Sequence, residues 1–207
     1  MSILGQLTHP DTELSPVAPS GCLHVTVATP VHHINRWAKA AEGSQGPPTP
    51  VKTIISTFNT NTIRLLPRCT ELASQASSYE ISILGIQEHR CVHPDEEIRF
   101  TEVEGMHLIT SSAWRELATM SAQGGVGLMV NSKAKEALRG VVSVSDRILT
   151  AEFDGNPVTS VIICYSPHNS SEEKEVEAFY SKLHQAVTSI PAHNFLAVLG
   201  DFNDRVY

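Results

Sequence analysis

The chain has 207 residues and a formal net charge of −7. This length favours one domain, with at most a tail beside it. The acidic balance argues against a nucleic-acid binder with a broad basic surface. Any nucleic-acid function must therefore depend on a local basic patch, or on metal ions that offset carboxylates.

The sequence contains no signal for export or for a membrane span. No apolar run approaches the ~20 residues of a transmembrane helix, and the first residues lack the basic and apolar regions of a secretory signal. The four cysteines lie far apart and form no C-x-x-C pair, which is typical of reduced thiols. We therefore expect an intracellular protein of the nucleus or cytoplasm, not secreted and with no membrane partner.

Proline marks a boundary near residue 50. Seven of the twelve prolines fall in the first 50 residues, and residues 41–50 have no periodic apolar positions. Repeated prolines prevent regular backbone hydrogen bonding. We therefore expect residues 1–50 to be a disordered, proline-rich leader, in which 22–30 could be a short strand, and residues 51–207 to be the folded domain.

From residue 51 onward, apolar runs of strand length alternate with helical patterns. A helix is predicted at 68–78, after Pro67. The sequence Asp-Gly-Asn at 154–156 indicates a hairpin between two of the strands. The predicted strands share an apolar character and lie at 51–58, 81–87, 106–110, 124–130, 147–153, 158–165 and 195–199.

The clearest helical pattern precedes the last strand. Apolar residues recur at helical spacing from Val176 to Ile190, and Pro191 ends the pattern. Ser170 and Glu173 have the spacing of a capping box at its start. Because strands and helices alternate and hairpins occur, the predicted fold class is α/β with mixed sheets.

Polar side chains follow four of the predicted strands at the point where each strand ends. Open α/β sheets bind ligands at such strand ends, so these side chains can converge on one cleft. Their oxygen atoms are hard ligands, which favours Mg²⁺ or Mn²⁺ over zinc. They are Asn59 and Asn61, then Glu88, then Tyr165 and His168, and finally Asp201 and Asn203.

Each of these residues also has a simpler interpretation. Asn59 could be a turn residue, and Asp201 could form an Asx turn. Glu88 could be a solvated carboxylate, and Tyr165 a core aromatic residue with a satisfied hydroxyl. Their joint placement after buried strands favours a functional site over four unrelated structural roles.

Two further patterns are interpreted as structural. His89 and His93 flank Cys91, but no second ligand pair lies at zinc-finger spacing, so a zinc site is not predicted. The glycines at 124, 125 and 127 lack the Lys-Ser/Thr ending of a P-loop. Close backbone packing is the better interpretation of these glycines.

Five motifs in this order resemble the endonuclease/exonuclease/phosphatase family. They are TFNTNTIR, LGIQEHR, GGVGLMV, CYSPHN and VLGDFND. Within the family, they are most similar to the apurinic-type endonuclease domains of LINE-like (non-LTR) retrotransposons and to craniofacial development protein 2-like proteins. The resemblance runs from about residue 51 to Tyr207. It implies a four-layer α/β sandwich with two mixed sheets flanked by helices.

The resemblance also implies a function, which is Mg²⁺- or Mn²⁺-dependent hydrolysis of DNA phosphodiester bonds by an endonuclease of retrotransposon type. Glu88 would bind the metal, Asp201 would orient or deprotonate the attacking water, and Asn203 would contact the scissile phosphate. By this resemblance, the metal site would consist of Glu88, Asn59 and Asn61. The catalytic residues would be Tyr165, His168, Asp201 and Asn203.

The chain departs from the family pattern at three points. Thr62 occupies a position where relatives often have Gly, and His168 one where many have Asn. The family also closes its site with an Asp-His pair further along the chain, and no such pair occurs before Tyr207. The resemblance thus implies a domain truncated before that motif, with an incomplete second half and weak or absent activity.

Two alternative functions stay open. One is a non-catalytic remnant that acts through protein contacts, which the acidic balance of residues 51–207 favours. The other is a phosphodiesterase of the same family with a substrate other than DNA.

Overall fold

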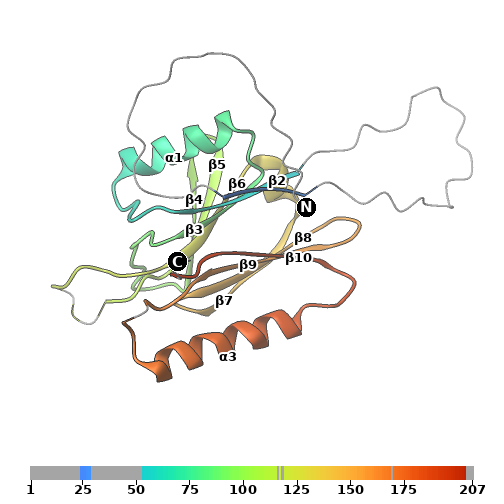
Figure 1. The fold of residues 1–207 in the computed structure, drawn as a ribbon. Helices are drawn as coiled ribbons and strands as arrows, with labels where there is room; N and C mark the ends of the chain where they lie inside the picture. The colour runs from blue at the N-terminus through green and yellow to red at the C-terminus, as the bar shows by residue number, and fades with distance from the viewer. Residues whose placement is uncertain (1–23, 29–52, 116, 118, 169, 204–207) are drawn as a thin grey trace, which may run out of the picture.

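Two β-sheets pack face to face in the computed structural model, which describes residues 24–28 and 53–203, except 116, 118 and 169. Helix α1 (Leu66–Ser78) covers the outer face of one sheet, and α3 (Glu173–Ser189) covers the outer face of the other (Figure 1). The layers therefore follow the order helix, sheet, sheet, helix. The predicted α/β sandwich with two mixed sheets is confirmed.

The first sheet has six strands and is mixed. Strands β2 and β3 run parallel, and every other neighbouring pair in it is antiparallel. The five residues of β3 are all buried, as its continuous apolar run predicts. In spatial order the strands are β1 (His24–Ala28), β2 (Thr53–Asn59), β3 (Ile83–Gln87), β6 (Val126–Val130), β5 (Met106–Ser111) and β4 (Ile98–Val103).

The second sheet has four strands and is also mixed. Its spatial order is β10 (Phe195–Asp201), β9 (Thr159–Tyr165), β8 (Ile148–Phe153) and β7 (Leu138–Ser145). Strands β8 and β9 pair antiparallel around residues 154–156, which confirms the predicted hairpin. Strands β9 and β10 run parallel, with α3 between them in the sequence.

Helix α3 starts later than the sequence predicts. Its first residue is Glu173, its N-cap is Glu172, and no side chain caps it. The predicted capping box is therefore wrong, because Ser170 lies outside the first turn. Glu173 and Glu175 lie in that turn instead, where the helix dipole favours negative charge.

Strand β1 lies inside the segment 1–50. Its five residues pair antiparallel with β2, from His24 opposite Thr57 to Ala28 opposite Thr53. The rest of the predicted leader lies outside the described residues. The division of the chain into a disordered leader and a domain from residue 51 stays a prediction.

The sequence pattern did not predict three elements, which are β4, β7 and the short helix α2 (Ser132–Ala137). Strands β4 and β7 each form an edge of their sheet. Most residues of β4 are exposed, and β7 has no buried residue. Edge strands exposed in this way carry few of the apolar positions that reveal a buried strand.

The core between the two sheets brings β3 close to β10. Ile109 and Leu128 of the first sheet and Val161 and Ile163 of the second are fully buried in one cluster. A Cβ atom added to Gly85 of β3 would lie 3.0 Å from Leu199 of β10. The small residue thus lets the two backbones approach, just before the strand ends that carry Glu88 and Asp201.

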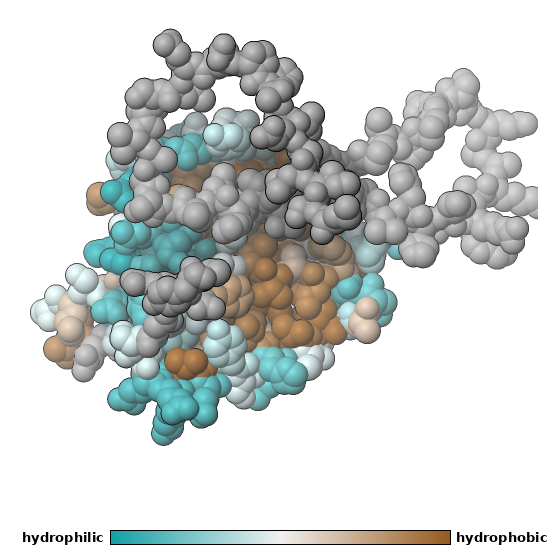
Figure 2. Space-filling view, in the orientation of Figure 1, coloured by the Kyte–Doolittle hydropathy of each residue, from teal (hydrophilic) through white to brown (hydrophobic). Residues whose placement is uncertain are grey.

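An apolar area lies over β10 on the face of the molecule seen in Figure 2. Phe195 and Val198 of this edge strand remain 41% and 39% exposed.

No helix among the described residues is long and apolar enough to cross a membrane.

Gly127 tests the packing of the first sheet. A Cβ atom at this position of β6 would lie 2.6 Å from the backbone oxygen of Ile109, which cannot move without disturbing β5. We expect Gly127→Ala to lower the free energy of unfolding by about 1–3 kcal/mol. Urea denaturation followed by circular dichroism measures this.

Gly140→Ala is the matched control, because a Cβ atom there would meet nothing within 4 Å. Its unfolding midpoint should equal or slightly exceed that of the unchanged chain. Equal midpoints for Gly127→Ala and the unchanged chain would contradict the close packing of β5 and β6.

Candidate active site

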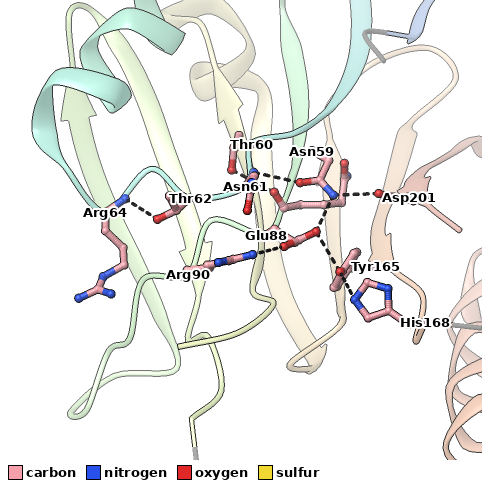
Figure 3. A network of polar contacts seen from close by, with 11 residues as sticks. Asn59, Thr60, Asn61, Thr62, Arg64, Glu88, Arg90, Tyr165, His168 and Asp201 are labelled. Atoms are coloured by element: carbon pink, nitrogen blue, oxygen red, sulfur yellow. Dashed lines mark hydrogen bonds and ion pairs between the residues drawn. The ribbon is translucent and has the colours of Figure 1, made fainter. Parts of the chain in front are cut away.

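Four strand ends meet at one edge of the sandwich. Asn59 ends β2 and pairs with Gln87 at the end of the parallel strand β3. Asp201 ends β10 and pairs with Tyr165 at the end of the parallel strand β9. Because each sheet contributes a parallel pair, the carboxyl ends of all four strands lie side by side (Figure 3).

The side-chain amide of Asn59 joins the two sheets. Its Nδ2 donates to Glu88 Oε1 at 2.8 Å and to Asp201 Oδ2 at 2.8 Å. Its Oδ1 accepts a hydrogen bond from the backbone N–H of Asn61 at 3.0 Å, which holds the amide in one orientation. Asn59 therefore brings two carboxylates toward one point.

Glu88 accepts three hydrogen bonds at this point. Besides Asn59, Tyr165 donates its hydroxyl to Oε1 at 2.9 Å, and Arg90 donates to Oε2 at 2.7 Å. Burial raises the pKa of the Glu88 carboxyl. The hydrogen bonds from Arg90, Asn59 and Tyr165 lower this pKa by a larger amount, so the pKa lies below its ordinary value. Glu88 is therefore an anion at neutral pH.

Tyr165 lies between Glu88 and His168. The Tyr165 hydroxyl is 3.1 Å from His168 Nε2, and the Arg147 guanidinium lies 5.6 Å from the ring centre. Burial, together with the hydrogen bond to Glu88 and the charge of Glu88, raises the pKa of Tyr165 to about 12. Its hydroxyl therefore keeps its proton and acts as a hydrogen-bond donor.

Asp201 and Asn203 form a tight turn after β10. The backbone N–H of Asn203 donates to Asp201 Oδ1 at 2.9 Å, which is an Asx turn. The Asn203 side chain donates to the backbone oxygen of Ser166 at 2.6 Å. Asp201 therefore takes part in both the turn and the site, because its other oxygen, Oδ2, accepts from Asn59.

Asn61 lies in the loop beside the site and is exposed. The contact that it makes with the site comes from its backbone N–H, through Asn59 Oδ1. The structure thus brings Asn59, Glu88, Tyr165, His168 and Asp201 into one hydrogen-bonded network and leaves Asn61 at its border. Asn203 joins this network through its backbone N–H to Asp201.

His89 points away from this network into the core. Its Nδ1 accepts from the backbone N–H of Cys91 at 3.0 Å, and its Nε2 lies 3.2 Å from the Val126 carbonyl oxygen. Burial lowers the pKa of His89 to about 4, so the ring is neutral. A Cβ atom on Gly125 would lie 2.5 Å from this ring, which agrees with the packing role predicted for the glycines.

Arg90 was not among the predicted site residues, but it contacts Glu88. It follows Glu88 by two residues, and both adopt left-handed backbone angles, with φ of +57° and +53°. This local turn directs the guanidinium back onto the carboxylate that precedes it. The only sequence signal was the position of Arg90 in the motif LGIQEHR.

The donor set of the site fits Mg²⁺. Among the described residues, no three His, Cys, Asp or Glu side chains gather closely enough to hold a metal by themselves. Mg²⁺ is usually held by one or two carboxylates, with water and substrate phosphates completing its shell. Glu88 and Asp201 supply two such carboxylates, and Glu88 Oε2 and the two Asp201 oxygens each accept one hydrogen bond and keep a lone pair.

Comparison with solved structures identifies the fold. A 3'-5' exonuclease from Neisseria meningitidis matches 72% of this chain and 57% of its own length, with a TM-score of 0.53 and 21% identity. An AP endonuclease from Archaeoglobus fulgidus matches 72% and 56%, with a TM-score of 0.52 and 21% identity. The chain has the endonuclease/exonuclease/phosphatase fold. At these identities the likeness shows the fold alone.

Curated proteins add a sequence likeness over part of the chain. Craniofacial development protein 2 of Bos taurus is 34% identical over 85 residues, which are 41% of this chain and 14% of that protein. The same protein of Tragulus javanicus is 33% identical over 85 residues, or 15% of its length. The match thus spans about one seventh of these relatives. No family model matches the chain. The resemblance expected from the motifs is confirmed at the level of the family fold.

The lowered pKa of Glu88 predicts a pH dependence of stability. Because the folded-state pKa lies below the ordinary value of 4.5, the stabilisation is fully present above that value and is lost as pH falls through the folded-state pKa. Between pH 7 and pH 3, the unchanged chain should lose more unfolding free energy than Glu88→Gln. Urea titrations at each pH measure this, and parallel pH profiles would contradict the hydrogen-bonded anion.

Thr62 tests the backbone of the loop. Its φ of +101° is unusual for a β-branched residue, and it lies where the family often has Gly. Such strain costs of order 1–3 kcal/mol, and the entropy of a glycine offsets part of the relief. We expect Thr62→Gly to raise the free energy of unfolding by about 1 kcal/mol.

Thr60→Gly is the control for this change. Thr60 has no positive φ, and its hydroxyl donates to the Gln87 carbonyl oxygen at 3.0 Å. Its replacement should therefore lower the unfolding midpoint. If both variants lower it, the loop is not strained at Thr62.

Proposed function

We propose that this chain is a divalent-metal-dependent phosphodiesterase that hydrolyses DNA, an endonuclease of the LINE-like retrotransposon type. The observation that carries the proposal is the network around Asn59, in which one amide holds the carboxylates of Glu88 and Asp201 at 2.8 Å each. The described solved structures of the same fold, an exonuclease and an AP endonuclease, support this reaction class.

Each residue of the network has a role in the proposed hydrolysis. Asp201 accepts a proton from the attacking water, and its backbone turn keeps the carboxylate directed at the site. The new bond forms between water oxygen and phosphorus, and the bond from phosphorus to the leaving oxygen breaks. Tyr165 would turn its hydroxyl from Glu88 to the phosphate, and Asn203 would donate there the side-chain N–H that Ser166 leaves free, where negative charge accumulates. His168 orients the Tyr165 hydroxyl from 3.1 Å.

Glu88 would be the main metal ligand, with Asn59 and Asn61 ordering the loop around it. When bound, Mg²⁺ or Mn²⁺ would neutralise phosphate charge in the transition state. We expect slow hydrolysis by the 207-residue chain. Among the described residues, His168 is the histidine of the network, and its ring contacts the Tyr165 hydroxyl instead of a carboxylate that would orient it.

Removal of the Glu88 charge tests the proposal. We expect the unchanged chain to nick supercoiled plasmid DNA in Mg²⁺ and to stop in EDTA. Glu88→Gln should nick ~10²-fold more slowly or not at all, because it loses the main carboxylate of the site. Gel electrophoresis of the relaxed product measures the rate.

Glu152→Gln is the control, because Glu152 lies on β8 outside the network and contacts Ser160 instead. It should nick at the rate of the unchanged chain. No nicking by the unchanged chain, or equal nicking by Glu88→Gln, would contradict the proposed reaction.

A further inference from the structure

A cleft beside the active site is lined by arginines in an otherwise acidic chain. It has a volume of ≈ 360 Å³, within the range of ligand pockets. Arg64, Arg99 and Arg115 line it together with His93, and none of its lining residues is acidic. Arg99 is paired with Glu96, and the three guanidinium groups together still give the cleft a local positive charge, as an acidic nucleic-acid enzyme requires.

The loops that carry the cleft are hydrogen-bonded to the loops that carry the site. Thr62 and Ile63 donate their backbone N–H groups to the carbonyl oxygens of Glu88 and His89, at 2.7 and 3.2 Å. The backbone N–H of Arg90 donates to Gly124 at 3.1 Å. These loops therefore form one surface, on which the cleft begins at Cys91, three residues after Glu88.

Two buried polar atoms on this segment have no partner. Among the described residues, Arg90 Nε and His93 Nδ1 are the buried side-chain nitrogen or oxygen atoms without a hydrogen bond. They lie three residues apart in the sequence, and His93 is 6% exposed where it lines the cleft. A buried polar atom without a partner usually marks a missing water, ion or ligand.

The His93 ring is held in place by its other nitrogen. His93 Nε2 lies 2.8 Å from Thr110 Oγ1, and the backbone N–H of His93 donates to Ser112 Oγ at 3.0 Å. Arg99 lies opposite Thr110 in the pairing of β4 with β5. When the Thr110 hydroxyl donates to Nε2, Nδ1 carries the proton.

Two exposed apolar side chains lie on either side of Arg115 in the sequence. Trp114 is 51% exposed and Met120 is 48% exposed, and Met120 lines the cleft. Trp114 is fixed by its backbone pairing with Gln123, at 3.1 and 2.8 Å. Aromatic side chains beside a basic groove are the usual platform for unpaired bases of a nucleic acid.

We infer that this cleft binds a backbone phosphate of the nucleic-acid strand next to the scissile phosphate, with an adjacent unpaired base lying on Trp114. This inference rests on the proposed function, and it adds a second contact with the strand. Arg64, Arg99 and Arg115 supply the charge, and the fixed His93 ring forms part of the wall. The cleft therefore favours a strand that is single-stranded beside the cut.

A binding assay in EDTA tests the inference without hydrolysis. The probe is a fluorescein-labelled, 12-nucleotide single-stranded DNA, followed by fluorescence anisotropy at several NaCl concentrations. Arg99→Gln should weaken binding about 5–10-fold and reduce the slope of log K against log [NaCl] by about 0.7, because one phosphate contact is lost. Trp114→Ala should weaken binding about 10-fold through the lost stacking.

Arg139→Gln is the matched control for Arg99→Gln. Both arginines lie on edge strands and pair with one carboxylate, Arg99 with Glu96 and Arg139 with Asp154, and their side chains are 44% and 47% exposed. Arg139→Gln should bind within two-fold of the unchanged chain. Arg115→Gln is a second cleft variant. It tests the cleft independently if Arg99→Gln disturbs folding through loss of the ion pair between Arg99 and Glu96.

The outcomes separate this inference from the proposed function. Equal losses for Arg99→Gln and Arg139→Gln, unchanged binding in both cleft variants, or no binding by the unchanged chain would overturn the inference. Binding that depends on Arg99 without any nicking in Mg²⁺ supports the cleft and contradicts only the hydrolysis. If the chain nicks DNA but its DNA binding does not depend on Arg99, only the proposed phosphate binding in the cleft is contradicted.

Discussion

One amide nitrogen connects the two sheets of this molecule at the point where two carboxylates meet. Asn59 Nδ2 donates to Glu88 in its own sheet and to Asp201 in the other, and Asp201 lies 142 residues away in the sequence. Without a donor between them, two carboxylates that both lie within hydrogen-bonding distance of one atom would repel each other, and at least one would tend to take up a proton. The arrangement of the other site residues depends on this bridge, because Tyr165 and Arg90 both donate to the carboxylate that Asn59 holds.

The packing of the sandwich makes this bridge possible. An amide spans two carboxylates only if the strand ends lie within a few ångströms, and Gly85 permits that approach because Leu199 fills the space of its missing side chain. The parallel pairs β2 with β3 and β9 with β10 then align four carboxyl ends at one edge. The buried apolar cluster between the sheets fixes their relative position. The chemistry of the edge is therefore a consequence of the core beneath it.

The charge distribution adds a second level of organisation. A net charge of −7 should repel a polyanion, yet three arginines line one cleft next to the two carboxylates. In the proposed complex, charges close to the strand would act with little screening, whereas the distant acidic surface is screened within about 8–10 Å at physiological ionic strength. A local patch can thus outweigh the overall balance. The overall charge was a poor guide to the surface at the site.

The order of the motifs and the apolar runs of β2, β3, β6, β8, β9 and β10 were sufficient to predict the fold class and the strand ends that carry Asn59, Glu88, Tyr165 and Asp201. Burial imposes this pattern on the sequence directly, since a buried strand must be apolar. Only the tertiary structure decided that one Asn59 nitrogen bridges two carboxylates, that Arg90 turns back onto Glu88, and that α3 begins at Glu173. The first two features depend on contacts between distant residues and on left-handed backbone angles, and neither leaves a periodic signal. The exposed edge strands β4 and β7 escaped prediction for a related reason, because residues that face water are under no apolar constraint.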